Sequence, residues 1–270
     1  MIKKYCRTLH TSINHKDLIS PSIVFSNHHL LAINKPPGWH SVPIANNSHS
    51  KKCLLTKLKN DKLGGGSTQD FLLPLHRIDQ PCTGIIVFAK NSKAARRIHS
   101  AWKKGNVEKE YLCVVENNRG SPIAIKYCQE TGRSNDVWHE LSGFYENNSI
   151  HQKTVHMSQN MSPSFSDPNI DSSKHKKNSR NCHIRYQILS SSISSTSYFD
   201  KTPSYSLLRV ITSTGARHQI RAMLSQLLKH PIAGDLRYGA ENGPLPDQSV
   251  SVTCKKTILA IRTVRRHGIS

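Results

Sequence analysis

Short runs of strand-forming residues recur along this chain of 270 residues and constrain its fold more than any other feature. Ile23–Phe25 and Leu30–Ile33 flank a polar turn at Asn27 and predict a hairpin. Further strands are predicted at Ile85–Ala89 and in the segments VEKEYLCVVE, CHIRYQILS and YSLLRVITS. Only two segments have clear helical periodicity, so we expect an α+β fold rather than a doubly wound sheet.

The first helical segment is NSKAARRIHSAWKKGN. Asn91 or Ser92 can cap it, apolar residues recur at every fourth position from Ala94 to Trp102, and Gly105 can end it. The rest of its surface carries five cations: Lys93, Arg96, Arg97, Lys103 and Lys104. The pattern favours equally a solvated basic face and a face that contacts RNA.

The second helical segment lies in TGARHQIRAMLSQLLKHPIAGD. An apolar stripe runs over Ile220–Leu228, and Pro231 ends it. Arg217 and Arg221 fall at the edge of this stripe, so both are predicted to be partly buried. A buried cation requires a carboxylate or phosphate partner, and Asp79 is the predicted partner of Arg221.

The charge balance predicts a polyanionic partner. The chain has 38 Lys and Arg against 17 Asp and Glu, a formal net charge of +21. Nucleic acid is the natural partner of such a chain, although a basic protein without a polyanionic ligand is the alternative. Seven cysteines without a C-x-x-C spacing indicate neither a zinc knuckle nor a redox motif, and no apolar run is long enough for a membrane span.

Two segments are predicted to lie outside the packed domain. Residues 1–16 combine cations and hydroxyls with no acid before Asp17, which is the composition of a mitochondrial targeting leader or of a basic RNA-binding tail. Residues 147–180 are rich in Ser, Asn, His and Lys, and we expect a flexible insertion that is dispensable for chemistry. We expect the remainder of residues 17–270 to form one domain, which would carry the catalytic residues if the protein is an enzyme.

The segment LHRIDQPCTGIIVFAK places one acid, Asp79, on a turn directly before a predicted core strand. An oriented, ionised carboxylate can serve as a nucleophile or a base. No second carboxylate stands beside it, which disfavours ordinary glycoside hydrolysis, and no metal-ligand cluster supports a nuclease. A turn-capping aspartate in an ion pair is the alternative.

The segment HRIDQPCTGIIVFAK closely resembles the signature of the RluA-type pseudouridine synthases, with Cys82 in place of the commonest threonine. LLAINKPPGWHSVP, KEYLCVV and TGARHQIRAMLSQLLKHPIAGDLRYG are similar to further blocks of that family, in the same order. TILAIRTVRR resembles the closing strand weakly, because Ala260 or Ile261 replaces its histidine.

The resemblance implies a mixed, mostly antiparallel sheet with a central catalytic cleft and flanking helices. It implies an isomerase without metal or cofactor that detaches a uracil, rotates it and rejoins it through C5. Asp79 matches the essential aspartate, Tyr111 the tyrosine that stacks on the base, and Arg221 the basic partner of the aspartate. His76 and Arg77 are expected to hold the flipped nucleotide. RNA contacts are expected from four further residues: Lys35, Arg217, His218 and Gln219.

The resemblance and the leader together suggest a monomeric, mitochondrial, fungal-type enzyme that modifies large-subunit rRNA. A tRNA pseudouridine synthase of the cytoplasm or nucleus is one alternative. A non-catalytic RNA-binding protein of ribosome assembly on the same fold is the other, although such a protein would be free to lose Asp79, Tyr111 and Arg221.

Overall fold

The computed structural model describes residues 20–43, 52–63, 71–117, 123, 137–146, 155–158, 180–191 and 204–241. The chain divides into two compact units, Met1–Ala95 and Arg96–Ser270, and each has its own sheet. Every strand pairing in both sheets is antiparallel, which confirms the α+β class. The predicted leader, residues 1–16, lies outside the described residues.

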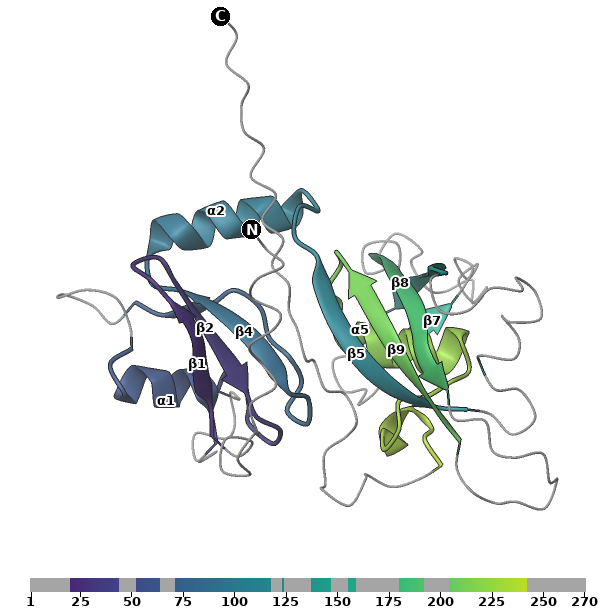
Figure 1. The fold of residues 1–270 in the computed structure, drawn as a ribbon. Helices are drawn as coiled ribbons and strands as arrows, with labels where there is room; N and C mark the ends of the chain where they lie inside the picture. Colours follow the sequence, from purple (N-terminus) through teal and green to yellow (C-terminus); the bar gives the residue numbers. More distant parts are fainter. Residues whose placement is uncertain are drawn as a thin grey trace, which may run out of the picture. The chain divides into compact units, whose positions relative to one another are not determined.

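The sheet of the first unit has the order β1-β2-β4-β3 (Figure 1). The predicted hairpin is confirmed, since β1 (Ser22–Ser26) and β2 (Leu30–Lys35) pair antiparallel. In the turn between them, the Asn27 Oδ1 accepts the backbone N–H groups of His29 and Leu30. The strands β4 (Gly84–Ala89) and β3 (Leu73–Pro74) and the helix α1 (Leu54–Asn60) complete the unit. Its core is made of fully buried residues from β2, β4 and α1: Leu31, Ile33, Ile86, Phe88 and Leu54.

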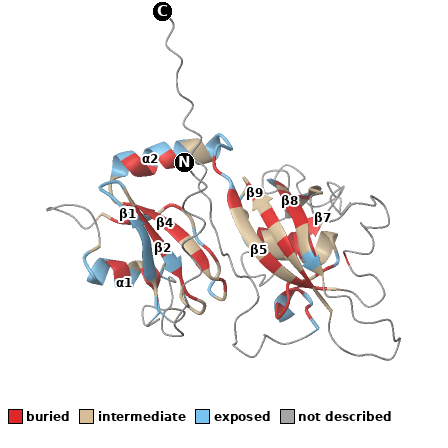
Figure 2. Ribbon diagram, in the orientation of Figure 1, coloured by how far each residue is buried: buried red, intermediate tan, exposed pale blue. Residues whose placement is uncertain are grey.

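The helix α2 (Ser92–Lys103) spans the boundary between the two units. Asn91 caps it as predicted, since its Oδ1 accepts the Ala94 N–H at 2.8 Å, and Gly105 follows its end with φ +70°. One side of α2 is buried and the other is exposed (Figure 2).

The sheet of the second unit has the order β5-β9-β8-β6-β7. The predicted strands are β5 (Lys109–Glu116), β8 (Arg180–Ser191) and β9 (Tyr205–Thr212). Sequence analysis missed β6 (His139–Glu146), whose residues HELSGFYE show little apolar alternation.

The second predicted helix begins as α5 (Gln219–Ala222) and continues as a π-helical segment, η3 (Met223–Leu227). It ends before Pro231 as predicted, with Lys229 in the left-handed region. A short 3-10 turn, η4 (Leu236–Tyr238), follows. In the described residues no helix is long and apolar enough to cross a membrane.

One part of the predicted flexible insertion is an ordered strand, so the prediction for residues 147–180 is wrong at that point. The strand β7 (His156–Ser158) pairs with β6, and both Val155 and Met157 are 3% exposed. Alternating apolar residues let this stretch add an edge strand even though its surroundings are polar. The other residues of the predicted insertion, 147–154 and 159–179, lie outside the described residues.

Candidate active site

The loop that carries Asp79 is held in place by its backbone on both sides of the acid. Ser41 Oγ donates to the Ile78 carbonyl at 2.7 Å, and the same Ser41 Oγ accepts the Ile78 N–H at 3.3 Å. On the other side, the Gly38 N–H donates to the Gln80 carbonyl at 2.9 Å. Gly38 has φ +78°, a conformation that favours glycine. These bonds fix the backbone on both sides of Asp79. Asp79 itself is half-buried, so part of the residue is accessible to solvent.

Lys35 was predicted to contact RNA, and the structure corrects this prediction. The residue is fully buried, and its Nζ donates to the carbonyls of Pro36 at 3.0 Å, Trp39 at 2.8 Å and Gln80 at 3.1 Å. Three carbonyls match the three donors of an ammonium group. Lys35 is therefore a structural cation that ties the turn after β2 to the Asp79 loop.

His76 and Arg77 lie on the same loop in different surroundings. His76 is half-buried, and its Nε2 accepts the Val87 N–H of β4 at 3.2 Å, so its ring helps to anchor the loop to the sheet. Arg77 is exposed, which is the placement that a phosphate contact requires. The RNA-binding roles of both residues stay predictions.

Tyr111 and the helical segment α5–η3 lie on the same face of the five-stranded sheet. An added Cβ at Gly143 of β6 would come within 2.7 Å of Leu227 Cδ1, so η3 packs directly on the face to which position 143 belongs. The strand register places Tyr111 on that face, where it is half-buried. One row of directly opposed residues crosses four strands there: Tyr111, Val210, Tyr186 and His139. The sheet thus presents Tyr111 on the face that also carries Arg221 of α5.

Arg221 is held by a carboxylate that sequence analysis missed. Its Nε and Nη2 donate to Asp235 Oδ2 and Oδ1 at 2.7 and 2.8 Å, a bidentate pair. The two side chains are 11% and 3% exposed, which confirms that Arg221 is partly desolvated. The guanidinium also lies 4.9 Å from the centre of the Tyr238 ring. Asp235 could have been found from the sequence as the acid of HPIAGD, the turn segment that directly follows the helix of Arg221.

The predicted pairing of Arg221 with Asp79 joins residues of the two different units and stays a prediction. The described bonds of the Arg221 guanidinium within its own unit include those to Asp235.

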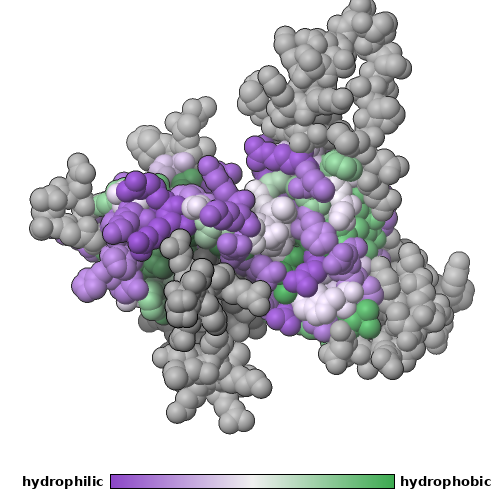
Figure 3. All heavy atoms as spheres, turned by 90° about the horizontal axis from the view of Figure 1, so that it is seen from above, coloured by the Kyte–Doolittle hydropathy of each residue, from purple (hydrophilic) through white to green (hydrophobic). Residues whose placement is uncertain are grey.

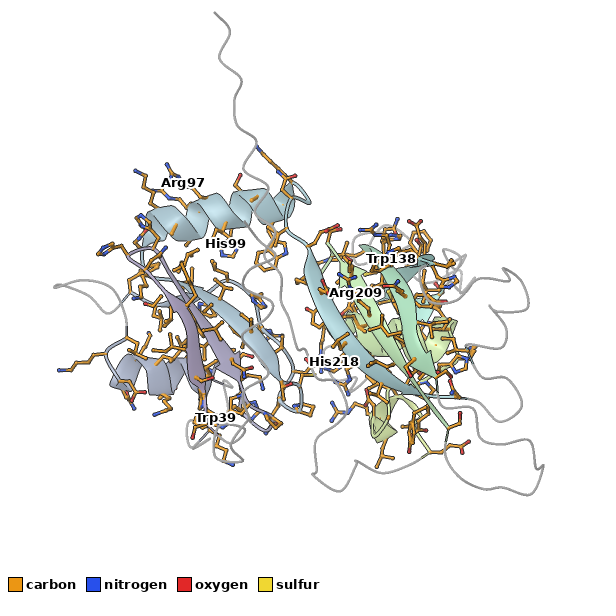
Figure 4. The ribbon with its side chains drawn as sticks, viewed as in Figure 1. Trp39, Arg97, His99, Trp138, Arg209 and His218 are labelled. Carbon is orange, nitrogen blue, oxygen red and sulfur yellow. The ribbon has the colours of Figure 1, made fainter. Side chains whose placement is uncertain are left out.

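His218 and Tyr238 form a polar contact beside this ion pair. The His218 Nδ1 lies 2.9 Å from the Tyr238 hydroxyl, and the Val155 N–H donates to the same hydroxyl at 3.1 Å. His218 has φ +53°, and a non-glycine residue in this region stores strain of a kind that occurs at functional sites. Figure 4 labels His218 on the second unit. Its predicted RNA contact stays a prediction.

Gln219 is 4% exposed, which argues against its predicted direct contact with RNA. Its Nε2 donates to Thr214 Oγ1 at 2.6 Å and to Thr212 Oγ1 at 3.2 Å. Its Oε1 accepts the Ala216 N–H at 3.0 Å. A buried amide with these bonds holds the loop before α5, so the geometry favours a positioning role.

Lys109 holds the same loop from β5. Its Nζ donates to the Thr214 carbonyl and would lie 2.9 Å from a Cβ at position 215, so the ammonium group passes close to Gly215. Arg217, two residues after Gly215, is exposed. The expectation that both arginines are partly buried is therefore wrong for Arg217, because the first helical residue is Gln219 and Arg217 precedes the packed stripe.

The thiol of Cys182 on β8 is chemically quiet. Burial raises the pKa of this thiol to about 11, although Arg180 and Lys109 lower it in part. At neutral pH the group is a neutral thiol, so it is no candidate for a nucleophile.

Comparisons with known proteins agree with this geometry. The family described as RNA pseudouridylate synthase matches residues 29–226. The chain is 29% identical over 220 residues to tRNA pseudouridine synthase C of Haemophilus ducreyi, covering 80% of this chain and 73% of the relative. It is 26% identical over 257 residues to the mitochondrial pseudouridylate synthase RPUSD4 of Rattus norvegicus, covering 92% of this chain and 59% of the relative.

A solved human structure shares the fold. Human RNA pseudouridylate synthase domain containing 4 aligns with a TM-score of 0.52 at 22% identity, over 83% of this chain and 71% of that chain. The family match covers the Asp79 loop, Tyr111 and Arg221 in one continuous stretch. This chain belongs to the RNA pseudouridylate synthase family, whose members are isomerases that convert uridine in RNA to pseudouridine.

Proposed function

We propose that Asp79 is the catalytic carboxylate of this isomerase and that Tyr111 and Arg221 act with it on one uridine. The observation that carries the proposal is the Asp79 loop, whose backbone is fixed at Ile78 and Gln80 while the acid stays accessible. An acid presented in this way can take part in covalent or proton-transfer chemistry without reorganisation of the loop.

The overall reaction is an isomerisation, so it requires no co-reactant. The bond between N1 and C1′ breaks, a bond between C5 and C1′ forms, and the proton on C5 is replaced by one on N1. Tyr111 would stack on the base, and Arg221 would balance the negative charge of Asp79. The base must leave its stack first, at a cost of a few kcal/mol that stacking and phosphate contacts offset.

As substrate we propose mitochondrial large-subunit rRNA. Two observations support it: the acid-free, basic leader over residues 1–16 and the similarity to a relative named as mitochondrial. The second candidate is tRNA, which is supported by the similarity to a tRNA pseudouridine synthase C. A monomer in the mitochondrion is part of the first proposal, and a location in the cytoplasm or nucleus belongs with the second.

Mapping pseudouridines in organellar and cytoplasmic RNA, with and without the gene, separates the two substrates. We expect one large-subunit rRNA site to lose its pseudouridine when the gene is removed. Reintroducing the wild-type gene should restore it, whereas the Asp79→Ala gene should not. Loss of a tRNA site alone would replace the first candidate with the second. A reporter fused to residues 1–25 tests the leader, and a diffuse cytosolic signal would refute import.

A further inference from the structure

The exposed side of the helix α2 is rich in cations. We define the α2 basic face as five residues, all of them exposed: Lys93, Arg96, Arg97, Lys103 and Lys104. The opposite side packs inward through Ala94, Ala95 and Ile98, which are 5 to 9% exposed. Figure 3, which views the molecule from the side of α2, shows hydrophilic residues gathered there, and Figure 4 shows Arg97 on the outer side of the helix.

The α2 basic face gathers five cations on and directly after one helix, with no acid among them. Elsewhere, Lys57 pairs with Asp61, Arg185 with Glu108, and Arg209 with Glu110. In the described residues around α2, no ion pair joins any of the five cations to an acid, and residues 91–107 contain no Asp or Glu.

At the start of the helix this arrangement costs stability rather than adding to it. Lys93 lies in the first turn, where the positive end of the helix dipole disfavours a cation, whereas Lys103 in the last turn is favourably placed. Lys93 and Arg97 are also four residues apart, and like charges at that spacing repel by a few tenths of a kcal/mol. A helix face selected only for solvation would interleave acids with its cations. The uncompensated charge therefore indicates an external anion.

The geometry suits a long polyanion. From Lys93 to Lys104 the helix rises by about 16 Å, and the long side chains form two rows along that length. Because the apolar side of α2 is buried in the protein, the helix has no free apolar face with which to enter a membrane surface. A chain of phosphates is the anion that fits these conditions.

We propose that the α2 basic face binds the phosphate backbone of the RNA substrate. The proposal rests on the proposed function for the identity of the polyanion. It adds a positioning surface that is independent of base identity, because phosphate contacts fix register and carry no sequence information.

The test is Lys93→Ala, Arg97→Ala and Lys104→Ala combined in one full-length variant. Alanine is the best helix former and the change relieves repulsion, so the variant should fold. We expect its affinity for a labelled tRNA transcript and a labelled large-subunit rRNA fragment to fall about 10- to 100-fold, and the salt slope of binding to decrease by about 2 to 3.

The matched control is Lys52→Ala, Lys59→Ala and Lys62→Ala combined, which removes the same charge from exposed positions on and beside α1. We expect this control to change affinity less than about threefold. An equal loss in both variants would show a general charge effect and overturn the proposal. Unchanged RNA binding with weakened binding to anionic phosphatidylserine vesicles would overturn it in favour of a membrane contact.

Pseudouridine formation, measured on the same RNAs, separates this proposal from the proposed function. If the wild-type protein forms pseudouridine and the α2 variant binds RNA as tightly as the wild type, the proposal for the α2 basic face is refuted and the proposed function stands. A wild-type protein that forms none on any RNA, but shows the α2 salt effect, would refute the proposed function alone.

Discussion

The Asp79 loop and the Arg221 helix hold their charged groups by different means. Around Asp79, the bonds connect backbone carbonyls and N–H groups to Lys35, Ser41 and Gly38. Around Arg221, the bonds end on the functional side chain itself, through the carboxylate of Asp235 and the ring of Tyr238.

This difference predicts how each residue responds to substitution. Removing the Asp79 side chain leaves the described backbone bonds of its loop intact. Removing Arg221 leaves the carboxylate of Asp235, which is 3% exposed, without its bidentate partner. Activity lost at Asp79 can therefore be assigned to chemistry, whereas activity lost at Arg221 includes a cost in stability.

The largest expected effect on stability is that of Arg221→Ala. Breaking a buried ion pair typically costs about 3–5 kcal/mol, and less for a partly wet pair such as this one. Arg221→Lys keeps the charge but loses the planar fork, so an intermediate loss is expected. Urea unfolding measures both, with Asp235→Asn as the reciprocal variant. An Arg221→Ala protein as stable as the wild type would contradict the role of the Asp235 pair.

In the first unit, Lys35→Met likewise removes a buried cation from its partners. Methionine keeps the apolar stem but removes the buried ammonium from three carbonyls, and we expect a loss of about 2–3 kcal/mol in the free energy of unfolding. Activity should fall as well, because the Gln80 carbonyl next to Asp79 loses a donor. If RNA affinity fell while stability stayed unchanged, the original prediction of an RNA contact would be right and the structural role wrong.

Ser41→Ala should have a smaller effect. It removes the hydroxyl that bonds both the carbonyl and the N–H of Ile78, at a cost of about 1–2 kcal/mol. Since Ser41 acts through the position of Asp79, we expect kcat to fall with little change in KM. Steady-state kinetics on an RNA that carries the target uridine measures kcat and KM separately. A change confined to KM would indicate an RNA contact instead.

Arg217→Ala should leave stability within about 0.5 kcal/mol, because the side chain is exposed. Its expected effect is on RNA binding, with the salt slope reduced by about 1. Binding measured over a series of KCl concentrations tests this. A slope equal to that of the wild type would remove Arg217 from the RNA-binding residues.

Sequence analysis predicted the elements that have strong local patterns. The hairpin at β1–β2, the strand β4 and the capped helix α2 were all predicted because their apolar spacing and turn residues agree. The strand β7 was missed because only Val155 and Met157 mark it, and a lone edge strand depends on pairing with β6 that local sequence does not encode.

The candidate site was predicted in its residue types and less well in their surroundings. Asp79, Tyr111 and Arg221 were identified by resemblance to a family. Sequence could not show that Lys35 and Gln219 point into the protein, because a polar residue in a motif has the same letter whether it binds RNA or a buried carbonyl. The partner Asp235 depends on a turn that folds back on α5, which is also tertiary information.

The most direct test of the account is pseudouridine formation by Asp79→Ala, measured together with its stability and its RNA affinity. The account predicts that no pseudouridine forms. It also predicts that the variant still folds, because the described backbone bonds of the loop remain, and that its RNA affinity stays within a few-fold of that of the wild type. Wild-type turnover by the alanine variant would contradict the assignment of Asp79 as the catalytic carboxylate.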